Sequence, residues 1–179
     1  TVVGGDNARK LAAKLASGRP LRVKLGVDPT APDIHLGHAV VLGKLREFQD
    51  AGHLAVLIIG DWTARVGDPS GRTSTRPMLD EAQIEENAAS YREQAFRILD
   101  PERTEIRPNG EWFARMGMEE LFRLAGSATV NRLLRRIDFA ERMSADRPVP
   151  VLDLLYPLMQ AYDSVMVQAD VELGGTDQL

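Results

Sequence analysis

The strongest constraint on the fold of this chain is a short, continuously apolar run, Leu54–Ile59. Runs of this kind are typical of strands that are buried on both faces of a parallel sheet. Residues 21–27 alternate apolar with polar and predict a second strand, whereas residues 34–52 carry apolar side chains at helical spacing and end at a glycine. A strand, a helix and a strand within about 40 residues form a βαβ unit. We therefore expect an α/β fold with a parallel sheet and helices on both faces.

The rest of the chain extends this pattern without internal repeats or low-complexity tracts. The remaining predicted elements are helices over 6–18, 80–99, 118–143 and 152–169, and strands over 104–107 and from 171 onward. Asp80 is the expected N-cap of the second of these helices. Residues 60–76 are rich in Gly, Asp, Pro, Ser and Thr. A loop of that length within a compact domain usually carries function.

The composition limits the class of protein. The 179 residues are 44% apolar and 27% charged, which is the balance of a soluble globular domain. The absence of cysteine excludes disulfides and thiolate zinc sites, and no apolar run approaches the roughly 18 residues of a membrane-spanning helix. A net charge of −4 gives no support for nucleic-acid binding over the whole surface. We expect a cytoplasmic protein without a membrane partner.

Two histidines stand where the first predicted strand turns into its helix. His35 and His38 are three residues apart, so they lie on one face of the first helical turn. Helix N-termini attract anions, and two imidazoles there can donate hydrogen bonds to a triphosphate, while Gly37 leaves room for a flat ring. The same spacing also suits a plain helix cap or a shared metal ion. Their position after a strand and a proline-rich turn favours a nucleotide site.

Two further motifs follow. Gly67–Gly71 with Arg72 resembles a phosphate-binding P-loop, but it is one residue short and lacks the lysine, so by itself it is most simply a turn. Tyr156, Gln160 and Asp163 form one stripe of the helix predicted over 152–169. Such a stripe can be a solvated face. The helix is otherwise mostly apolar, which favours a largely buried helix whose polar stripe is a pocket wall.

The chain ends in a glycine-rich motif, Gly174–Gln178, that follows the last predicted strand. Two glycines permit close approach of the backbone to a ribose, and an aspartate can accept hydrogen bonds from ribose hydroxyls. On its own, a motif of this kind is most often a turn.

Taken in order, the run Lys24–His38 and these later motifs resemble the tyrosyl-tRNA synthetases of bacterial type. The sequence His-Leu-Gly-His looks like the "HIGH" signature of class I aminoacyl-tRNA synthetases. The resemblance covers nearly the whole chain and implies a Rossmann-like catalytic domain. It also implies ATP-dependent activation of L-tyrosine to tyrosyl adenylate, followed by transfer to tRNA(Tyr).

The resemblance also implies roles for individual residues. The expected catalytic residues, which would stabilise the ATP phosphates, are His35, His38 and Thr30. The expected ATP-binding residues are Gly26, Asp28, His35, Gly37, His38, Gly174 and Asp177. The expected tyrosine-binding residues are Lys24, Asp68, Tyr156, Gln160, Asp163 and Gln178. Asp163 would accept a hydrogen bond from the substrate hydroxyl, and that contact is the physical basis for rejecting phenylalanine.

The implied organisation is a helical segment over 1–20 and a catalytic domain over 21–179, with a helical, dimer-forming insertion over about 113–150. The expected partners are L-tyrosine, ATP with Mg²⁺, tRNA(Tyr) and a second copy of the chain, with no tightly bound cofactor and no metal held by the protein. The mobile Lys-Met-Ser-Lys-Ser loop and the anticodon-binding region of the family are missing, which is expected of a catalytic-domain fragment. Lys24 stands where some tyrosyl enzymes carry a tyrosine that binds the substrate hydroxyl.

Three alternatives compete with this interpretation. A nucleotidylyltransferase can have a similar His-x-Gly-His site but has no reason to carry the stripe of Tyr156, Gln160 and Asp163. A tryptophanyl enzyme is close, although Asp163 suits a phenol hydroxyl. A non-catalytic relative could keep the fold to bind RNA or protein.

Overall fold

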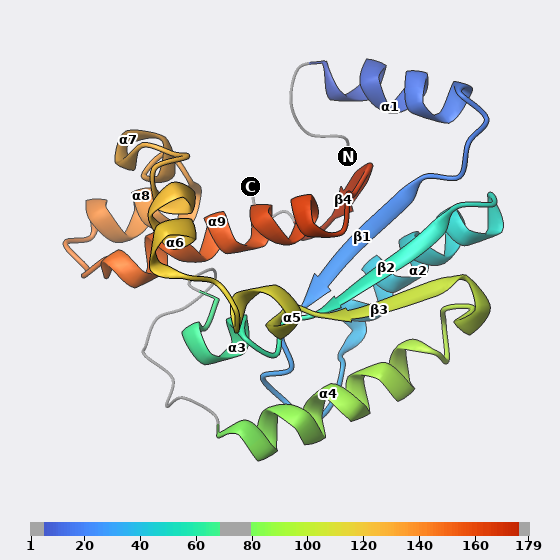
Figure 1. The fold of residues 1–179 in the computed structure, drawn as a ribbon, viewed down its shortest axis with the longest axis horizontal. Coiled ribbons are helices and arrows are strands. Elements are labelled where there is room, and N and C mark those ends of the chain that lie inside the picture. Colours follow the sequence, from blue (N-terminus) through green and yellow to red (C-terminus); the bar gives the residue numbers. More distant parts are fainter. Residues whose placement is uncertain (1–5, 69–79, 176–179) are drawn as a thin grey trace.

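Four parallel strands form the centre of the computed structural model, which describes residues 6–68 and 80–175 (Figure 1). The strands are β1 (Arg22–Val27), β2 (Leu54–Ile59), β3 (Thr104–Pro108) and β4 (Val171–Leu173). Their order across the sheet is β3-β2-β1-β4, so β1 has a partner on both sides. Parallel neighbours need crossover connections, which here contain helices.

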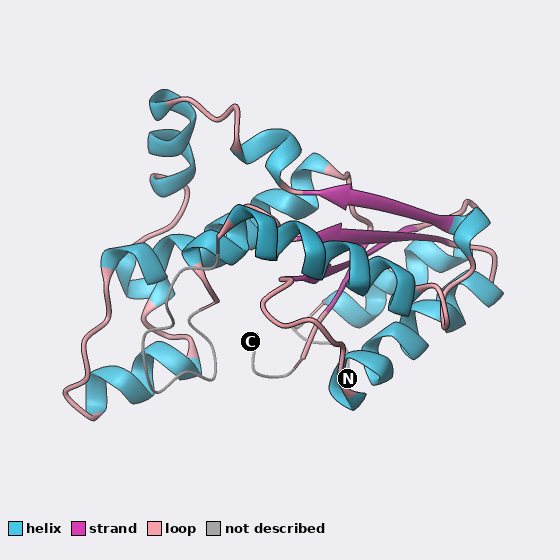
Figure 2. Cartoon of the chain, turned by 90° about the horizontal axis from the view of Figure 1, so that it is seen from below, coloured by secondary structure: helices cyan, strands magenta, loops and turns pink. Residues whose placement is uncertain are grey.

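Nine α-helices and one 3₁₀ helix occur in the part of the chain that the structure describes. They are α1 (Asn7–Ala16), α2 (Leu36–Asp50), α3 (Thr63–Val66), α4 (Glu81–Ala95), η1 (Pro101–Arg103), α5 (Gly110–Phe113), α6 (Met118–Ala125), α7 (Val130–Leu133), α8 (Ile137–Ser144) and α9 (Val151–Met166). The long helices run alongside the strands (Figure 2). Within the described residues, none of these helices is both long and apolar enough to cross a membrane.

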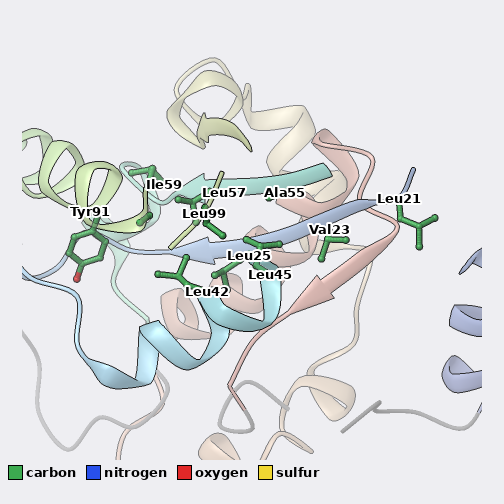
Figure 3. Close-up of a cluster of buried hydrophobic side chains, with 11 residues drawn as sticks. Leu21, Val23, Leu25, Leu42, Leu45, Ala55, Leu57, Ile59, Tyr91 and Leu99 are labelled. Carbon is green, nitrogen blue, oxygen red and sulfur yellow. The ribbon is translucent and has the colours of Figure 1, made fainter. Parts of the chain in front are cut away.

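The apolar run predicted as a doubly buried strand is β2, and its alternate side chains enter two different cores. Ala55, Leu57 and Ile59 pack with side chains of β1, α2 and α4 (Figure 3). Val56 and Ile58 point to the opposite face, where they pack with side chains of α5 and α9. The sheet therefore lies between two helical layers, as the sequence predicted.

Two sequence predictions need correction, and two others are confirmed. The segment expected to be one long loop over 60–76 contains helix α3, and its residues 69–76 lie outside the described residues. The helices expected over 118–143 are confirmed as the three short helices α6, α7 and α8, the last of which ends at Ser144. Helix α9 is less buried than its apolar sequence indicated, because Val151 and Val165 are 75% and 68% exposed. The predicted cap of α4 is confirmed, since the Asp80 side chain accepts a hydrogen bond from the backbone N–H of Gln83.

Gln49, near the end of α2, is a buried polar residue with 1% of its surface exposed. Its amide nitrogen lies 3.1, 2.9 and 2.9 Å from the oxygens of Asp100 O, Arg103 O and Thr104 Oγ1. Its amide oxygen accepts a hydrogen bond from Asp100 N at 3.0 Å. The side chain thus fixes α2 to the turn that leads into β3.

We expect Gln49→Leu to lower the free energy of unfolding by about 3 kcal/mol, because it leaves several buried backbone groups without a partner. Urea denaturation measures this change. Lys44→Leu on the exposed side of the same helix is the control and should change the free energy of unfolding by less than about 0.5 kcal/mol. Similar losses in both variants would show that the hydrogen bonds of Gln49 are not what stabilises this junction.

Candidate functional site

A cavity of about 410 Å³ opens where β1, β2 and β4 end. Parallel strands present their carboxyl ends at the same edge of a sheet, so the segments that follow them meet there. Every described residue that the sequence selected lines this cavity: Lys24, Gly26, Asp28, Thr30, His35, Gly37, His38, Asp68, Tyr156, Gln160, Asp163 and Gly174. Asp177 and Gln178 lie outside the described residues. Residues from 24 to 174 in the sequence are therefore brought to one site.

The two histidines begin helix α2 and cap it reciprocally. His35 is the N-cap residue, and its Nδ1 accepts a hydrogen bond from Gly37 N at 3.1 Å. His38 Nδ1 accepts from His35 N at 3.2 Å, and the two ring centroids are 4.1 Å apart. Because each Nδ1 is an acceptor, the neutral rings carry their proton on Nε2, which leaves two N–H donors for a ligand in the cavity. Burial lowers the pKa of His38, and the neighbouring His35 adds to that effect.

Gly37 is required by the histidine pair itself. A Cβ atom at this position would lie 2.9 Å from His35 Cε1 and 3.0 Å from His35 Nδ1. The flat ring that lies against the backbone of Gly37 is therefore the imidazole of His35. Any larger residue would displace that ring from its capping position.

A chain of hydrogen bonds connects two carboxylates that line the cavity, Asp28 and Asp163. Asp28 accepts from Tyr156 OH at 2.8 Å and from Thr63 Oγ1 at 2.7 Å. Thr63 Oγ1 in turn accepts from Asn109 Nδ2 at 2.9 Å, and the same nitrogen lies 3.4 Å from Asp163 Oδ2. Two carboxylates on different elements are thus held in fixed orientations by neutral donors.

Trp112 completes the surroundings of Asp163, because its Nε1 donates to Asp163 Oδ1 at 2.9 Å. Asp163 is only 5% exposed, and burial raises its pKa to about 6. The positive charge of Lys24 is the largest effect that acts in the opposite direction. Burial also raises the pKa of Asp28 to about 7, and the hydrogen bonds from Thr63 and Tyr156 offset only part of that effect. Both carboxyls are ionised only above mildly acidic to neutral pH. They are then strong acceptors in a site of low polarity.

The stripe on α9 faces the cavity as predicted. Tyr156 and Asp163 are buried and Gln160 is partly buried, and all three line the cavity wall. Burial raises the pKa of Tyr156 well above its ordinary value, and the negative charge of Asp28 is the next largest cause of this increase. The phenol is therefore neutral, and it donates to Asp28 while its oxygen can still accept a hydrogen bond.

Lys24 lies at the bottom of the cavity with 1% of its surface exposed. Its Nζ donates to Glu172 Oε1 at 2.8 Å and to Gln160 O at 3.2 Å. The sequence predicted that this lysine is part of the site, and the structure adds its ion-pair partner on β4.

The sequence analysis did not select five residues that build the site, of which Trp112 is described above. Thr63 and Asn109 connect the two carboxylates, and Gly60 makes room for them, since a Cβ there would lie 1.9 Å from Asp28 Oδ1. Glu172 pairs with Lys24. Gly60 directly follows the strand predicted over 54–59, and Asn109 lies two residues after the strand predicted over 104–107. Position at the end of a parallel strand was the signal that could have identified both residues. Thr63 and Glu172 carry no comparable signal.

The described residues contain no candidate metal site formed by three or more side chains. Among residues 6–68 and 80–175, no three histidine or carboxylate side chains lie close enough together to hold a metal ion. The cavity combines imidazole donors at the start of α2 with carboxylate acceptors from Asp28, directly after β1, and from Asp163 on α9.

Comparisons with known proteins identify the family of this chain. Residues 16–179 match the family described as tRNA synthetases class I (W and Y). The chain is 65% identical over 159 residues to the tyrosine–tRNA ligase of Thermotoga maritima and 55% identical over 173 residues to that of Moorella thermoacetica. These alignments cover 89% and 97% of this chain but 40% and 42% of the relatives. The chain therefore spans about two fifths of the length of these two relatives.

Solved structures show the same fold. The tyrosyl-tRNA synthetase of Archaeoglobus fulgidus, in complex with L-tyrosine, is similar with a TM-score of 0.74 at 26% identity, covering 96% of this chain and 51% of that one. A C-terminally truncated mitochondrial tyrosyl-tRNA synthetase of Aspergillus nidulans has a TM-score of 0.79 at 26% identity, covering 95% and 52%. The predicted Rossmann-like sheet is thus confirmed, and the nucleotidylyltransferase alternative is wrong. The chain belongs to the class I tRNA synthetase family of the tryptophan and tyrosine type, and the relatives named here are all tyrosine enzymes.

Proposed function

We propose that this chain carries the amino-acid site and most of the ATP site of a tyrosine–tRNA ligase. The enzyme activates L-tyrosine with ATP to tyrosyl adenylate and transfers the tyrosyl group to tRNA(Tyr). One observation carries this proposal above the others. A buried carboxylate, Asp163, and two imidazole donors at a helix N-terminus line the same cavity.

The end of the cavity near Asp163 suits the phenol of tyrosine. Trp112 donates to one carboxylate oxygen of Asp163 and Asn109 to the other, and these two contacts fix the orientation of the carboxylate. Each oxygen has a further lone pair that can accept a hydrogen bond from a substrate hydroxyl. Phenylalanine would leave this buried acceptor without its partner, which costs more than the loss of one exposed hydrogen bond. Asp68, Tyr156 and Gln160 line the same cavity and are proposed to accept hydrogen bonds from the α-ammonium group.

The end of the cavity near His35 and His38 suits a triphosphate. Neither step of the proposed reaction needs a nucleophile from the protein. The expected rate acceleration therefore comes from positioning of the reactants and electrostatic stabilisation of the transition state. The Nε2 groups of both histidines and the Thr30 side chain are proposed to contact the phosphates. Contacts to the adenylate are proposed for Gly26, Asp28 and Gly174. Magnesium is proposed to arrive with ATP, and tRNA(Tyr) to receive the product.

The second proposed partner is another copy of this chain. Six apolar side chains that are more than half exposed gather between residues 118 and 151, within the proposed insertion over 113–150 and at its border with α9: Met118, Phe122, Val130, Ile137, Met143 and Val151. Exposed apolar side chains in such number are typical of an interaction surface. A symmetric dimer would bury this surface on both copies.

The first prediction from the proposed function concerns amino-acid selectivity. Calorimetry on the folded chain should detect L-tyrosine binding and at least 100-fold weaker binding of L-phenylalanine, roughly the cost of leaving a buried charged acceptor unpaired. Asp163→Asn should bind the two amino acids within about tenfold of each other, because an amide is a weaker acceptor than a carboxylate.

Asp153→Asn is the matched control for that variant, since Asp153 lies on the same helix but does not line the cavity. It should leave the preference for tyrosine unchanged. A folded chain that binds neither amino acid would overturn the proposed function and favour a non-catalytic role for the domain.

The second prediction uses the raised pKa of Asp28, about 7 against an ordinary value of 3.8. Between pH 3.8 and about pH 7, the Asp28 carboxyl is protonated in the folded state but ionised in the unfolded state. The free energy of unfolding therefore falls as pH rises through this range, and the whole loss remains above pH 7. Asp28→Asn removes this loss. From pH 5 to pH 8, the wild-type chain should lose roughly 2 kcal/mol of unfolding free energy relative to the variant. Urea denaturation measures both proteins at each pH. A difference in unfolding free energy between wild type and Asp28→Asn that is the same at pH 5 and pH 8 would contradict the raised pKa of Asp28.

The third prediction concerns self-association. Phe122→Asp should weaken dimerisation at least tenfold in sedimentation equilibrium, because it places a charge in the proposed apolar interface. Arg123→Asp, on the exposed surface of the same helix, should change the dimerisation constant by less than threefold. A wild-type chain that stays monomeric at millimolar concentration would overturn the proposal of a dimer.

A further inference from the structure

Glu172 stands behind the candidate site rather than in it. It lies in the middle of β4, which pairs with β1 so that Glu172 is directly opposite Lys24. Strand β4 lies beside β1 and follows α9 (Figure 1). Glu172 lines a second cavity of about 800 Å³, and Gln160 lines both cavities. Gln160 thus borders the ligand site and also contacts Glu172 directly, through its Nε2 at 3.2 Å from Glu172 Oε1.

Three donors from two different elements converge on the Glu172 carboxylate. Oε1 accepts from Lys24 Nζ at 2.8 Å and from Gln160 Nε2 at 3.2 Å, and Oε2 accepts from Ser164 Oγ at 2.8 Å. Gln160 and Ser164 are one turn apart on α9. The carboxylate thus joins the site helix to the central strand by contacts to both of its oxygens.

The contact with Gln160 decides which end of that amide faces the ligand. An amide has its donor nitrogen and its acceptor oxygen on opposite sides, so holding Nε2 at Glu172 directs Oε1 away from Glu172. Gln160 lines the candidate site, and an amide oxygen there is an acceptor for a cation such as an ammonium group. Without Glu172 the amide can turn over and present its nitrogen, which would repel the same cation.

The contact with Lys24 balances a buried charge. An ammonium group that is 1% exposed is stable only with a counter-ion and further acceptors, which here are Glu172 and the carbonyl of Gln160. The positive charge of Lys24 in turn opposes the effect of burial on the pKa of Asp163. The ion pair therefore also influences the second carboxylate of the site.

We infer that Glu172 is a positioning residue for the amino-acid site, which orients the Gln160 amide toward the ligand's ammonium group and holds Lys24 beneath it. This inference rests on the proposed function, because it takes L-tyrosine as the ligand. Glu172 itself does not contact the ligand in this proposal and acts through Gln160 and Lys24.

Calorimetric titration of the full chain with L-tyrosine tests it. Glu172→Ala should weaken binding about tenfold, the size of one charge-assisted hydrogen bond. In a Gln160→Ala background, Glu172→Ala should weaken binding by less than about threefold, because the group that Glu172 positions is already gone. A purely structural role would give the same loss in both backgrounds, and that result would overturn the inference.

Glu105→Ala is the matched control. Glu105 forms a similar cross-strand ion pair, with Arg22 of β1 at 2.6 Å, but does not line the candidate site. It should change tyrosine affinity by less than twofold, and a tenfold loss would overturn the inference. If Glu172→Ala does not fold, Glu172→Gln keeps the size and one acceptor oxygen, and it should show a smaller loss, about threefold, that again vanishes in the Gln160→Ala background.

The outcome for the wild-type chain separates this inference from the proposed function. Tyrosine binding that is equally strong in Glu172→Ala would overturn only the role of Glu172. A folded wild-type chain that does not bind tyrosine would overturn the proposed function and this inference with it.

Discussion

The parallel pairing of β1 with both of its neighbours sets the position of every polar group in the site. Val27 at the end of β1 is opposite Ile59 at the end of β2, and Leu25 is opposite Leu173 at the end of β4. The segments that leave these three strands therefore start from one edge of the sheet. Side chains alternate along a strand, so a shift of one residue in this register would exchange the two faces of the sheet. The two helical layers that bury Leu57 and Val56 on opposite faces prevent such a shift.

The chain of hydrogen bonds from Asp28 to Asp163 shows how this framework keeps two carboxylates close to each other. Asp163 is buried and Asp28 is partly buried, and burial raises the pKa of each. Thr63 and Asn109 hold them in place with neutral donors, which orient the acceptors without neutralising them. Acceptors that are fixed in advance need little reorganisation when a ligand with matching donors binds. A charged pair within the protein would satisfy these acids more fully and would leave less for a ligand.

Local sequence predicted the elements well wherever the determining interaction is itself local. The reciprocal cap of His35 and His38 and the cap at Asp80 involve residues only two or three positions apart, so spacing alone indicates them. The exposed apolar side of α9 was not predicted, since Val165 reads as a core residue unless the packing of the helix is known. Short helix α3 was missed because a single turn of helix within a glycine- and proline-rich segment has no periodicity to detect.

The sequence by itself determined the alternation of strands and helices, the histidine pair at the start of a helix and the polar stripe on another. These features depend on neighbours within one or two turns, and the physical chemistry of a short segment is enough to specify them. Only the tertiary structure decided that Thr63 connects Asp28 to Asn109, and that Glu172 is the partner of Lys24. Those contacts join residues that are about 35 to 150 positions apart. Their distances are fixed by strand register and helix packing, which no local pattern encodes.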